Sequence, residues 1–137
     1  MHRWMGLLSS LMTVGILGFG CTPAISDLPP GGVREIVLIT SNMRFIGEKP
    51  DSIKGLENPD IIVYLNDKVK ITIKNRETNL IIHDFAISNY PEARAKQAIR
   101  PTEETTVEFT ASRPGDFTYY CRNHQTSMYG RFIVLRR

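Results

Sequence analysis

The sequence predicts an all-β fold, a sandwich or barrel of seven short strands in one domain. Short runs rich in β-branched and aromatic residues recur along the chain, and turn-forming residues separate them. Strands at such intervals are typical of β-sandwiches and barrels. The length of 137 residues and the composition, 42% hydrophobic and 23% charged, fit one globular domain of ordinary size.

The seven predicted strands lie between residues 35 and 135. They cover residues 35–40, 61–65, 68–75, 81–88, 105–110, 116–120 and 130–135. Turn formers at 65–67, 75–77 and 113–116 separate neighbouring strands, at spacings typical of antiparallel all-β domains. We therefore expect antiparallel pairing rather than a parallel sheet.

Two other segments lie between the predicted strands. Residues 91–99 are rich in helix-favouring residues, and Pro101 follows them as a stop signal, so we expect one short helix there. Residues 47–59 are polar, with two prolines and two glycines, and we expect a long loop.

The first residues have the organisation of an export signal. Arg3 precedes an uncharged apolar run over residues 5–20, which is shorter than the roughly 20 apolar residues that a membrane-spanning helix needs. Cys21 follows and resembles the acylated cysteine of a bacterial lipoprotein. Gly18 and Phe19 depart from that processing motif, so ordinary signal cleavage nearby is the alternative.

The chain is therefore expected to divide into three parts. They are a signal peptide of the lipoprotein type at 1–21, a turn-rich linker at 22–33 and a folded domain at 34–137. Both processing alternatives export the domain, to the periplasm or the outer face of a membrane, and a lipid on Cys21 would anchor it there. Loss of Arg3 lowers the formal charge from +3 to +2, too little for a nucleic-acid-binding protein.

Soft metal ligands gather near the end of the chain. Cys121, His124 and Met128 follow the predicted strand 116–120 with the spacing Cys-x2-His-x3-Met. Because Cys121 ends a strand and the chain then turns back, a loop here brings three donors round one point. Two imidazoles, one thiolate and a weak axial thioether are the ligand set of blue-copper electron-transfer sites. The loop lacks only a second histidine.

His83 supplies that histidine. In the predicted strand 81–88, alternation places His83, Phe85 and Ile87 on one face, so the imidazole shares the core side with two apolar groups. Alone, such a histidine is more often a hydrogen-bonded core residue, but the downstream loop reverses that interpretation. The residues predicted to hold the metal are His83, Cys121, His124 and Met128.

Each member of this set also has an ordinary structural explanation. A single cysteine packs in a core as a small apolar residue, and Met128 could fill a gap in the core. His124 in a polar loop would usually be solvated. Their joint occurrence at loop spacing favours the metal site. Met43, the other methionine of the predicted domain, is expected to be core packing near the first strand.

Four motifs occur together between residues 35 and 135. They are Met43-Arg44-Phe45, His83-Asp84-Phe85, the run 113–121 before the thiolate, and Met128-x-Gly130. In these motifs the chain resembles the cupredoxins, the family of plastocyanin, pseudoazurin and amicyanin. The resemblance implies a Greek-key β-sandwich or barrel of about seven to eight strands with one short helix. It also implies one type 1 copper ion on the four predicted ligands.

One spacing and one residue depart from the family pattern. The gap of three residues between His124 and Met128 lies between an amicyanin-like spacing of two and a plastocyanin-like spacing of four, so the subclass stays open. Asp84 stands where the family often has an asparagine that ties the ligand loops together. A carboxylate there would change the surroundings of the ligands and the reduction potential.

The resemblance implies a carrier of single electrons outside the cytoplasm. It implies that the imidazole edge of His124 reaches the surface in an apolar patch, to which Tyr90, Pro91 and Tyr129 could contribute. The expected partners of a monomer are redox proteins such as c-type cytochromes or copper and haem oxidoreductases, met through small interfaces, with no nucleic acid.

Other functions compete with this interpretation. Copper storage or delivery would use the same four residues without a redox partner, although such proteins more often have several exposed Met or His residues. No Ser-His-acid arrangement, paired inward carboxylates or second metal cluster argues for an enzyme. A structural β-sandwich lipoprotein without metal is the remaining alternative.

Overall fold

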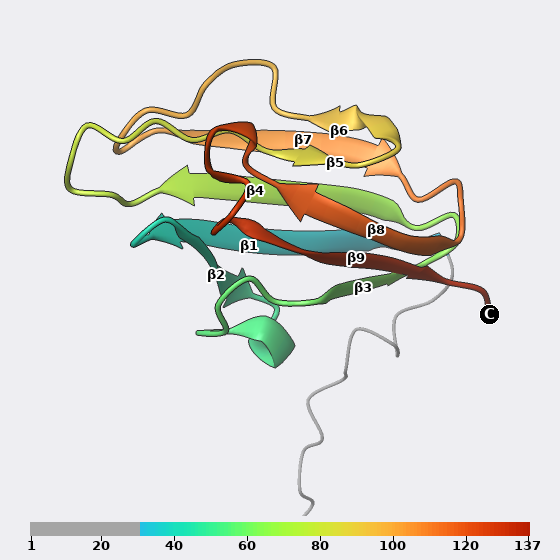
Figure 1. Cartoon of the computed structure of the whole chain (residues 1–137). Helices are drawn as coiled ribbons and strands as arrows, with labels where there is room; N and C mark the ends of the chain where they lie inside the picture. The colour runs from blue at the N-terminus through green and yellow to red at the C-terminus, as the bar shows by residue number, and fades with distance from the viewer. Residues whose placement is uncertain (1–30) are drawn as a thin grey trace, which may run out of the picture.

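The computed structural model describes residues 31–137, which form two β-sheets that face each other (Figure 1). The all-β prediction is confirmed. The predicted signal peptide, Cys21 and most of the predicted linker lie outside the described residues. Within residues 31–137, no helix has the length and apolar character to cross a membrane.

One sheet has four strands in the order β2-β1-β4-β7. The strands are β1 Val33–Ser41, β2 Arg44–Lys49, β4 Lys68–Asn75 and β7 Glu104–Thr110. Buried side chains alternate with more exposed ones along these strands. One face of the sheet therefore covers the core, and the other faces solvent.

The other sheet has five strands in the order β3-β9-β8-β5-β6. The strands are β3 Ile61–Tyr64, β5 Ala86–Ile87, β6 Tyr90–Arg94, β8 Gly115–Tyr120 and β9 Tyr129–Leu135. Aromatic rings meet between the sheets: Phe45 of β2 contacts Tyr119 of β8 edge to face, with ring centroids 5.5 Å apart. Such pairs add to the stability that apolar burial supplies.

Strand pairing corrects one expectation. Most neighbours are antiparallel, as predicted, but β1 pairs with β4 and β3 pairs with β9 in parallel. Parallel neighbours need a long crossover connection. Here β2 and β3 lie between β1 and β4 along the chain, and β3 belongs to the opposite sheet. The sequence pattern indicates strands but not which of them become neighbours.

The hairpin of β1 and β2 corrects two further expectations. Asn42 and Met43 both have positive φ, 51° and 54°, as a tight two-residue hairpin turn requires. Met43 therefore lies at the tip of the hairpin, 41% exposed, and the prediction that it packs in the core was wrong. The predicted loop at 47–59 begins inside β2 and contains a 3-10 helix, Asp51–Ile53.

The short helix predicted at 91–99 is absent. Its first residues form β6, and its backbone hydrogen bonds go to another segment: Ala95 N–H donates to Phe85 O at 2.8 Å, and Ile99 N–H donates to His83 O at 2.8 Å. Burial of Ala95 and Ile99 against the core outweighs the weak helix propensity. The predicted strand 81–88 is correspondingly short, since only β5 and a bridge between His83 and Ile99 pair as strand.

Candidate metal centre

Three of the four predicted ligands meet at one end of the sandwich. The potential donor atoms of His83, Cys121 and His124 all lie within 4.8 Å of one another. Cys121 Sγ is 3.9 Å from Nδ1 of His83 and 3.5 Å from Nδ1 of His124. Both imidazoles therefore turn the same ring nitrogen toward the thiol, and their ring centroids are 5.0 Å apart.

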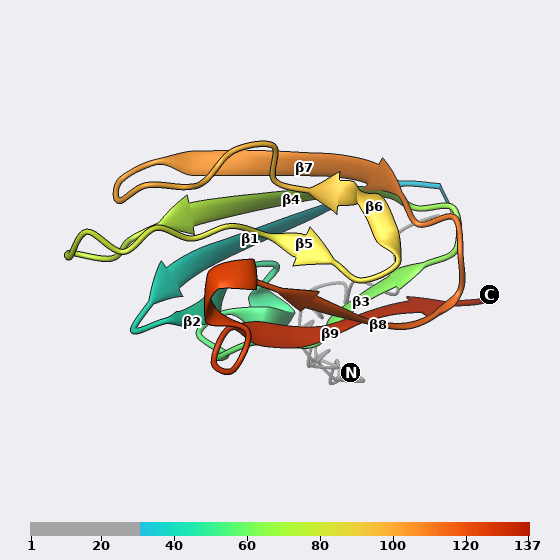
Figure 2. The same ribbon diagram turned by 45° about the horizontal axis from the view of Figure 1, so that its top comes forward.

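The loop between β8 and β9 places Cys121 and His124. Cys121 directly follows β8, and a 3-10 helix, Arg122–His124, turns the chain back toward β9 (Figure 2). His124 N–H donates to Cys121 O at 3.1 Å, and Cys121 N–H donates to Met128 O at 3.0 Å. These bonds close the loop at its base, as the Cys-x2-His-x3-Met spacing predicts.

Met128 stands where this loop rejoins β9. Its N–H donates to His124 O at 2.8 Å, and its side chain is completely buried. The structure thus brings its backbone beside Cys121. The role of its thioether as the axial ligand stays a prediction.

The buried side-chain amide of Asn75 holds the segment that carries His83. Asn75, the last residue of β4, donates through Nδ2 to Ile81 O and to Ile99 O, both at 2.9 Å. Its Oδ1 accepts the hydroxyl of Thr40 at 2.9 Å. Sequence reasoning missed Asn75 because a polar residue at the end of a strand is an ordinary turn signal, and only its complete burial reveals the role.

Asp84 joins the two ligand segments. Its N–H donates to Cys121 Sγ at 3.4 Å, and its carboxylate accepts Arg122 N–H at 2.6 Å and pairs with the Arg122 guanidinium. The aspartate therefore ties His83 to Cys121 through adjacent residues, the task that the family pattern gives to asparagine. Arg122 balances its charge, a partner that the sequence spacing does not reveal.

The segment 47–59 also supports the loop between β8 and β9. Asn58 accepts Phe45 N–H at 3.0 Å through Oδ1 and donates through Nδ2 to Ser127 O at 2.9 Å. A single side chain thus connects β2 to the loop that carries His124. The sequence predicts only a polar loop here, because nothing in the spacing of Asn58 relates it to Ser127.

Burial shifts the pKa of two of the predicted ligands. Burial first, and then the charge of His124, lowers the pKa of His83, so its imidazole is neutral and can bind metal. Burial also raises the pKa of the Cys121 thiol, which therefore keeps its proton until a metal displaces it. Two imidazole nitrogens and one soft sulfur fit the donor preference of copper.

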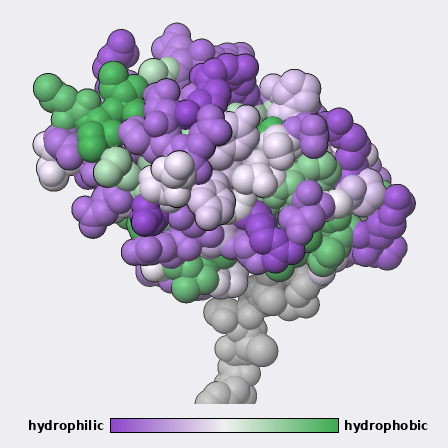
Figure 3. Space-filling model, in the orientation of Figure 1, coloured by the Kyte–Doolittle hydropathy of each residue, from purple (hydrophilic) through white to green (hydrophobic). Residues whose placement is uncertain are grey.

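The surface near the cluster differs from expectation at Tyr90. Tyr90 is 1% exposed and its hydroxyl donates to Arg113 O, so it belongs to the core and not to a surface patch. Tyr129 and Pro91 are exposed and His124 is half-buried, as the predicted patch requires. Leu80, 93% exposed, and Ile82 add an apolar surface over the loop between β4 and β5 (Figure 3).

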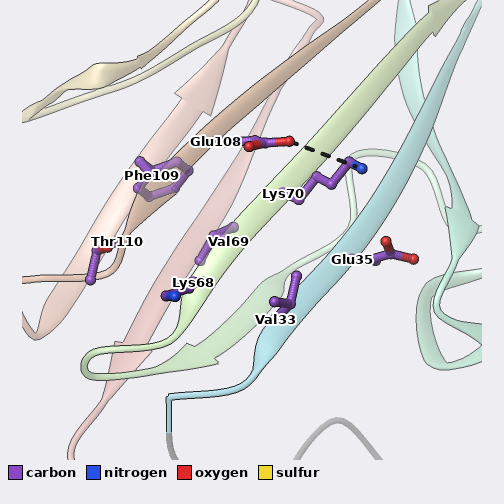
Figure 4. A pocket seen from close by; sticks show the side chains of 8 residues that line it. All are labelled: Val33, Glu35, Lys68, Val69, Lys70, Glu108, Phe109 and Thr110. Atoms are coloured by element: carbon purple, nitrogen blue, oxygen red, sulfur yellow. Dashed lines mark ion pairs between the residues drawn. The ribbon is translucent and has the colours of Figure 1, made fainter.

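A separate depression lies on the outer face of the four-stranded sheet (Figure 4). It is centred on Lys70, whose Nζ lies 4.0 Å from Glu108 Oε1 and whose other strand neighbour is Glu35. Charges of opposite sign thus alternate across the three strands. The depression contains no predicted ligand, and the cluster of His83 and Cys121 remains the candidate site.

Comparison with known proteins agrees with this geometry. The profile of the cupredoxin-like domain family matches residues 53–134, more than half of the chain. Over 93 residues, 61% of the chain, it is 33% identical to a copper-containing nitrite reductase of Rhizobium sullae. A second such reductase, from Alcaligenes faecalis, is 35% identical over 66 residues, 46% of the chain. The matches span only 25% and 18% of those two relatives.

Solved structures show the same fold. A copper nitrite reductase from Nitrosomonas europaea aligns with 77% of the chain and 42% of its own, with a TM-score of 0.58 and 21% identity. Rusticyanin from Thiobacillus ferrooxidans aligns with 80% of the chain and 85% of its own, with a TM-score of 0.55 and 16% identity. By its family match, its two sheets and its His-Cys-His cluster, the chain belongs to the cupredoxin-like domain family.

Proposed function

We propose that this chain binds one type 1 copper ion and carries single electrons between redox partners outside the cytoplasm. The observation that carries the proposal is the convergence of two imidazole Nδ1 atoms and one thiol sulfur within 4.8 Å. His83, Cys121 and His124 would be the equatorial ligands and Met128 the weak axial ligand. Bound copper would supply a one-electron couple between its two common oxidation states.

The surrounding residues support electron carriage. Asn75, Asp84 and Asn58 hold the ligand segments through buried or half-buried hydrogen bonds, so the ligands need little rearrangement when the charge of the site changes. His124 is half-buried, which lets its imidazole edge face a partner. Exposed Leu80 and Ile82 at the same end offer an apolar surface for a short-lived redox complex.

Copper titration of the apoprotein tests the proposal. We expect one equivalent of Cu(II) to produce an intense visible band, and cyclic voltammetry to show a reversible one-electron couple. Binding without a visible band would contradict the type 1 site. An irreversible couple with ready release of copper would favour storage or delivery, which uses the same four residues.

The nitrite reductases among the relatives do not make this chain an enzyme. It spans at most about a quarter of those curated relatives, and residues 31–137 contain one His-Cys-His cluster. We propose a non-enzymatic carrier whose partners are c-type cytochromes or copper and haem oxidoreductases. An assay of the purified copper protein for nitrite reduction with a chemical electron donor should show no turnover.

Met128→Leu is expected to keep copper and to raise the reduction potential. A thioether at long distance supports Cu(II) more than Cu(I), so its loss favours the reduced form. Redox titration measures the shift. Met43→Leu is the matched control, because Met43 lies exposed in the hairpin turn. The reduction potential of this variant should equal that of the wild type. A shift in the control alone would mean that Met128 is not the axial ligand.

Cys21→Ala is expected to release the full-length protein from membranes or to block its processing. The proposal that Cys21 carries acyl chains rests on the sequence before it, and stable anchoring usually takes more than one acyl chain. Fractionation of cells and mass spectrometry of the mature N-terminus measure the outcome. An unmodified N-terminus downstream of Cys21 would contradict the anchor and leave export in place.

A further inference from the structure

Glu77, in the turn after β4, has a carboxylate with no part in the cluster described above. Its side chain is only 7% exposed, although carboxylates are seldom buried unless they are paired. Glu77 Oε1 accepts Met43 N–H at 2.9 Å and lies 3.6 Å from Nε2 of His83. The buried charge thus lies between a backbone donor and a proposed ligand.

The two ring nitrogens of His83 have different surroundings. Nδ1 faces Cys121 at 3.9 Å, whereas Nε2 is the buried side-chain polar atom that lacks a hydrogen bond within residues 31–137. A separation of 3.6 Å from Glu77 is longer than an ordinary N–H to O bond. Once Nδ1 binds a metal, the only N–H of the ring is at Nε2, and Glu77 is in place to accept it.

The buried side-chain amide of Asn75 holds both the backbone of Glu77 and the segments around His83. Glu77 N–H donates to Asn75 Oδ1 at 3.0 Å, while Asn75 Nδ2 holds Ile81 O and Ile99 O. His83 N–H in turn donates to Ile99 O at 3.0 Å. The fold therefore holds the carboxylate and the imidazole close to each other.

We propose that Glu77 is a positioning residue for His83: its carboxylate accepts the Nε2 proton, fixes the tautomer and ring orientation, and by its charge favours Cu(II) over Cu(I). The inference rests on the proposed copper function. Carboxylates commonly orient metal-ligating histidines in this way, and loss of such a partner typically costs about 10-fold to 100-fold in metal affinity.

Glu77→Gln separates this role from a structural one. The amide oxygen still accepts Met43 N–H, so the apoprotein should unfold at the wild-type temperature, but the negative charge is gone. We expect Cu(II) affinity to fall about tenfold more than Cu(I) affinity, which raises the potential by about 59 mV. Glu108→Gln is the matched control, because it removes the same charge from the outer face of the sheet (Figure 4).

Equal potentials in Glu77→Gln, Glu108→Gln and the wild type would overturn the proposal. A second measurement needs no copper: in proton-nitrogen NMR spectra of the wild-type apoprotein, the Nε2 proton of His83 should be visible and slow to exchange. Its absence there overturns the proposal whatever the variants do. Failure of the wild type to bind copper instead overturns the proposed function.

Discussion

Replacing Cys121 by serine should abolish the visible charge-transfer band of the copper protein. Cys121 is the free cysteine within residues 31–137, and its sulfur lies within 3.9 Å of both imidazole nitrogens. A serine hydroxyl stays protonated at neutral pH and is a hard donor, so it provides neither the soft ligand nor the thiolate from which the transition arises. Visible absorption of the copper-loaded variant measures the loss.

The apoprotein of this variant should remain folded. Serine is nearly isosteric, and its hydroxyl oxygen can accept Asp84 N–H as the sulfur does. Circular dichroism and thermal unfolding check this point. Thr126→Ala is the control, because Thr126 is exposed in the same loop and its loss should leave the band intact. A serine variant with the wild-type spectrum would exclude Cys121 as the ligand.

Replacing Arg34 by methionine is expected to destabilise the fold by about 3–5 kcal/mol, the usual result of leaving one partner of a buried ion pair alone. Arg34 Nε donates to Asp67 Oδ2 at 2.5 Å, and the two side chains are 2% and 0% exposed. The same oxygen accepts Tyr64 N–H at 2.9 Å, so the carboxylate joins β1, β3 and the start of β4. Urea unfolding measures the change.

The pH dependence of this effect identifies its cause. Burial alone would raise the pKa of Asp67, but the Arg34 hydrogen bond and charge and the Tyr64 N–H outweigh burial and lower it. The pair therefore stabilises the wild type above the unfolded pKa of about 3.9, and this stability is lost as the pH falls through the folded pKa. In Arg34→Met, burial should raise the pKa, so the destabilisation should shrink toward acid pH.

Two further variants delimit the explanation. Arg34→Met combined with Asp67→Leu removes both charges and should recover much of the lost stability. Asp116→Asn breaks the exposed pair with Arg131 and should change stability little. An Arg34→Met protein as stable as Asp116→Asn would mean that Asp67 finds other compensation.

The cluster of His83, Cys121 and His124 was predictable from sequence because its strongest signal is local. Cys121, His124 and Met128 lie on one short loop whose spacing bends back on itself, and hydrogen bonds between residues three to seven apart close it. His83 was reached by strand alternation, although the regular strand proves to be only Ala86–Ile87. His83 is buried beside Cys121 all the same, because its burial does not depend on a long strand.

The failed expectations share a different cause. Residues 91–99 have helix propensity, yet their backbone groups pair with residues near His83. No local sequence pattern indicates this pairing. Met43 has the composition of a core residue, but the hairpin turn places it at the exposed tip of the hairpin. In both cases a contact or turn outside the local composition decides the outcome, and propensity is too weak to oppose it.

The sequence by itself determined the all-β class, the family resemblance and the residues of the candidate site, because periodicity and loop spacing are properties of consecutive residues. Only the tertiary structure decided the parallel pairings, the bonds of Asn58 and Asn75 to distant carbonyls, and the approach of Glu77 to His83. Those contacts follow from which faces of the two sheets are buried against each other, and burial of a polar side chain is set by the packing of the whole chain.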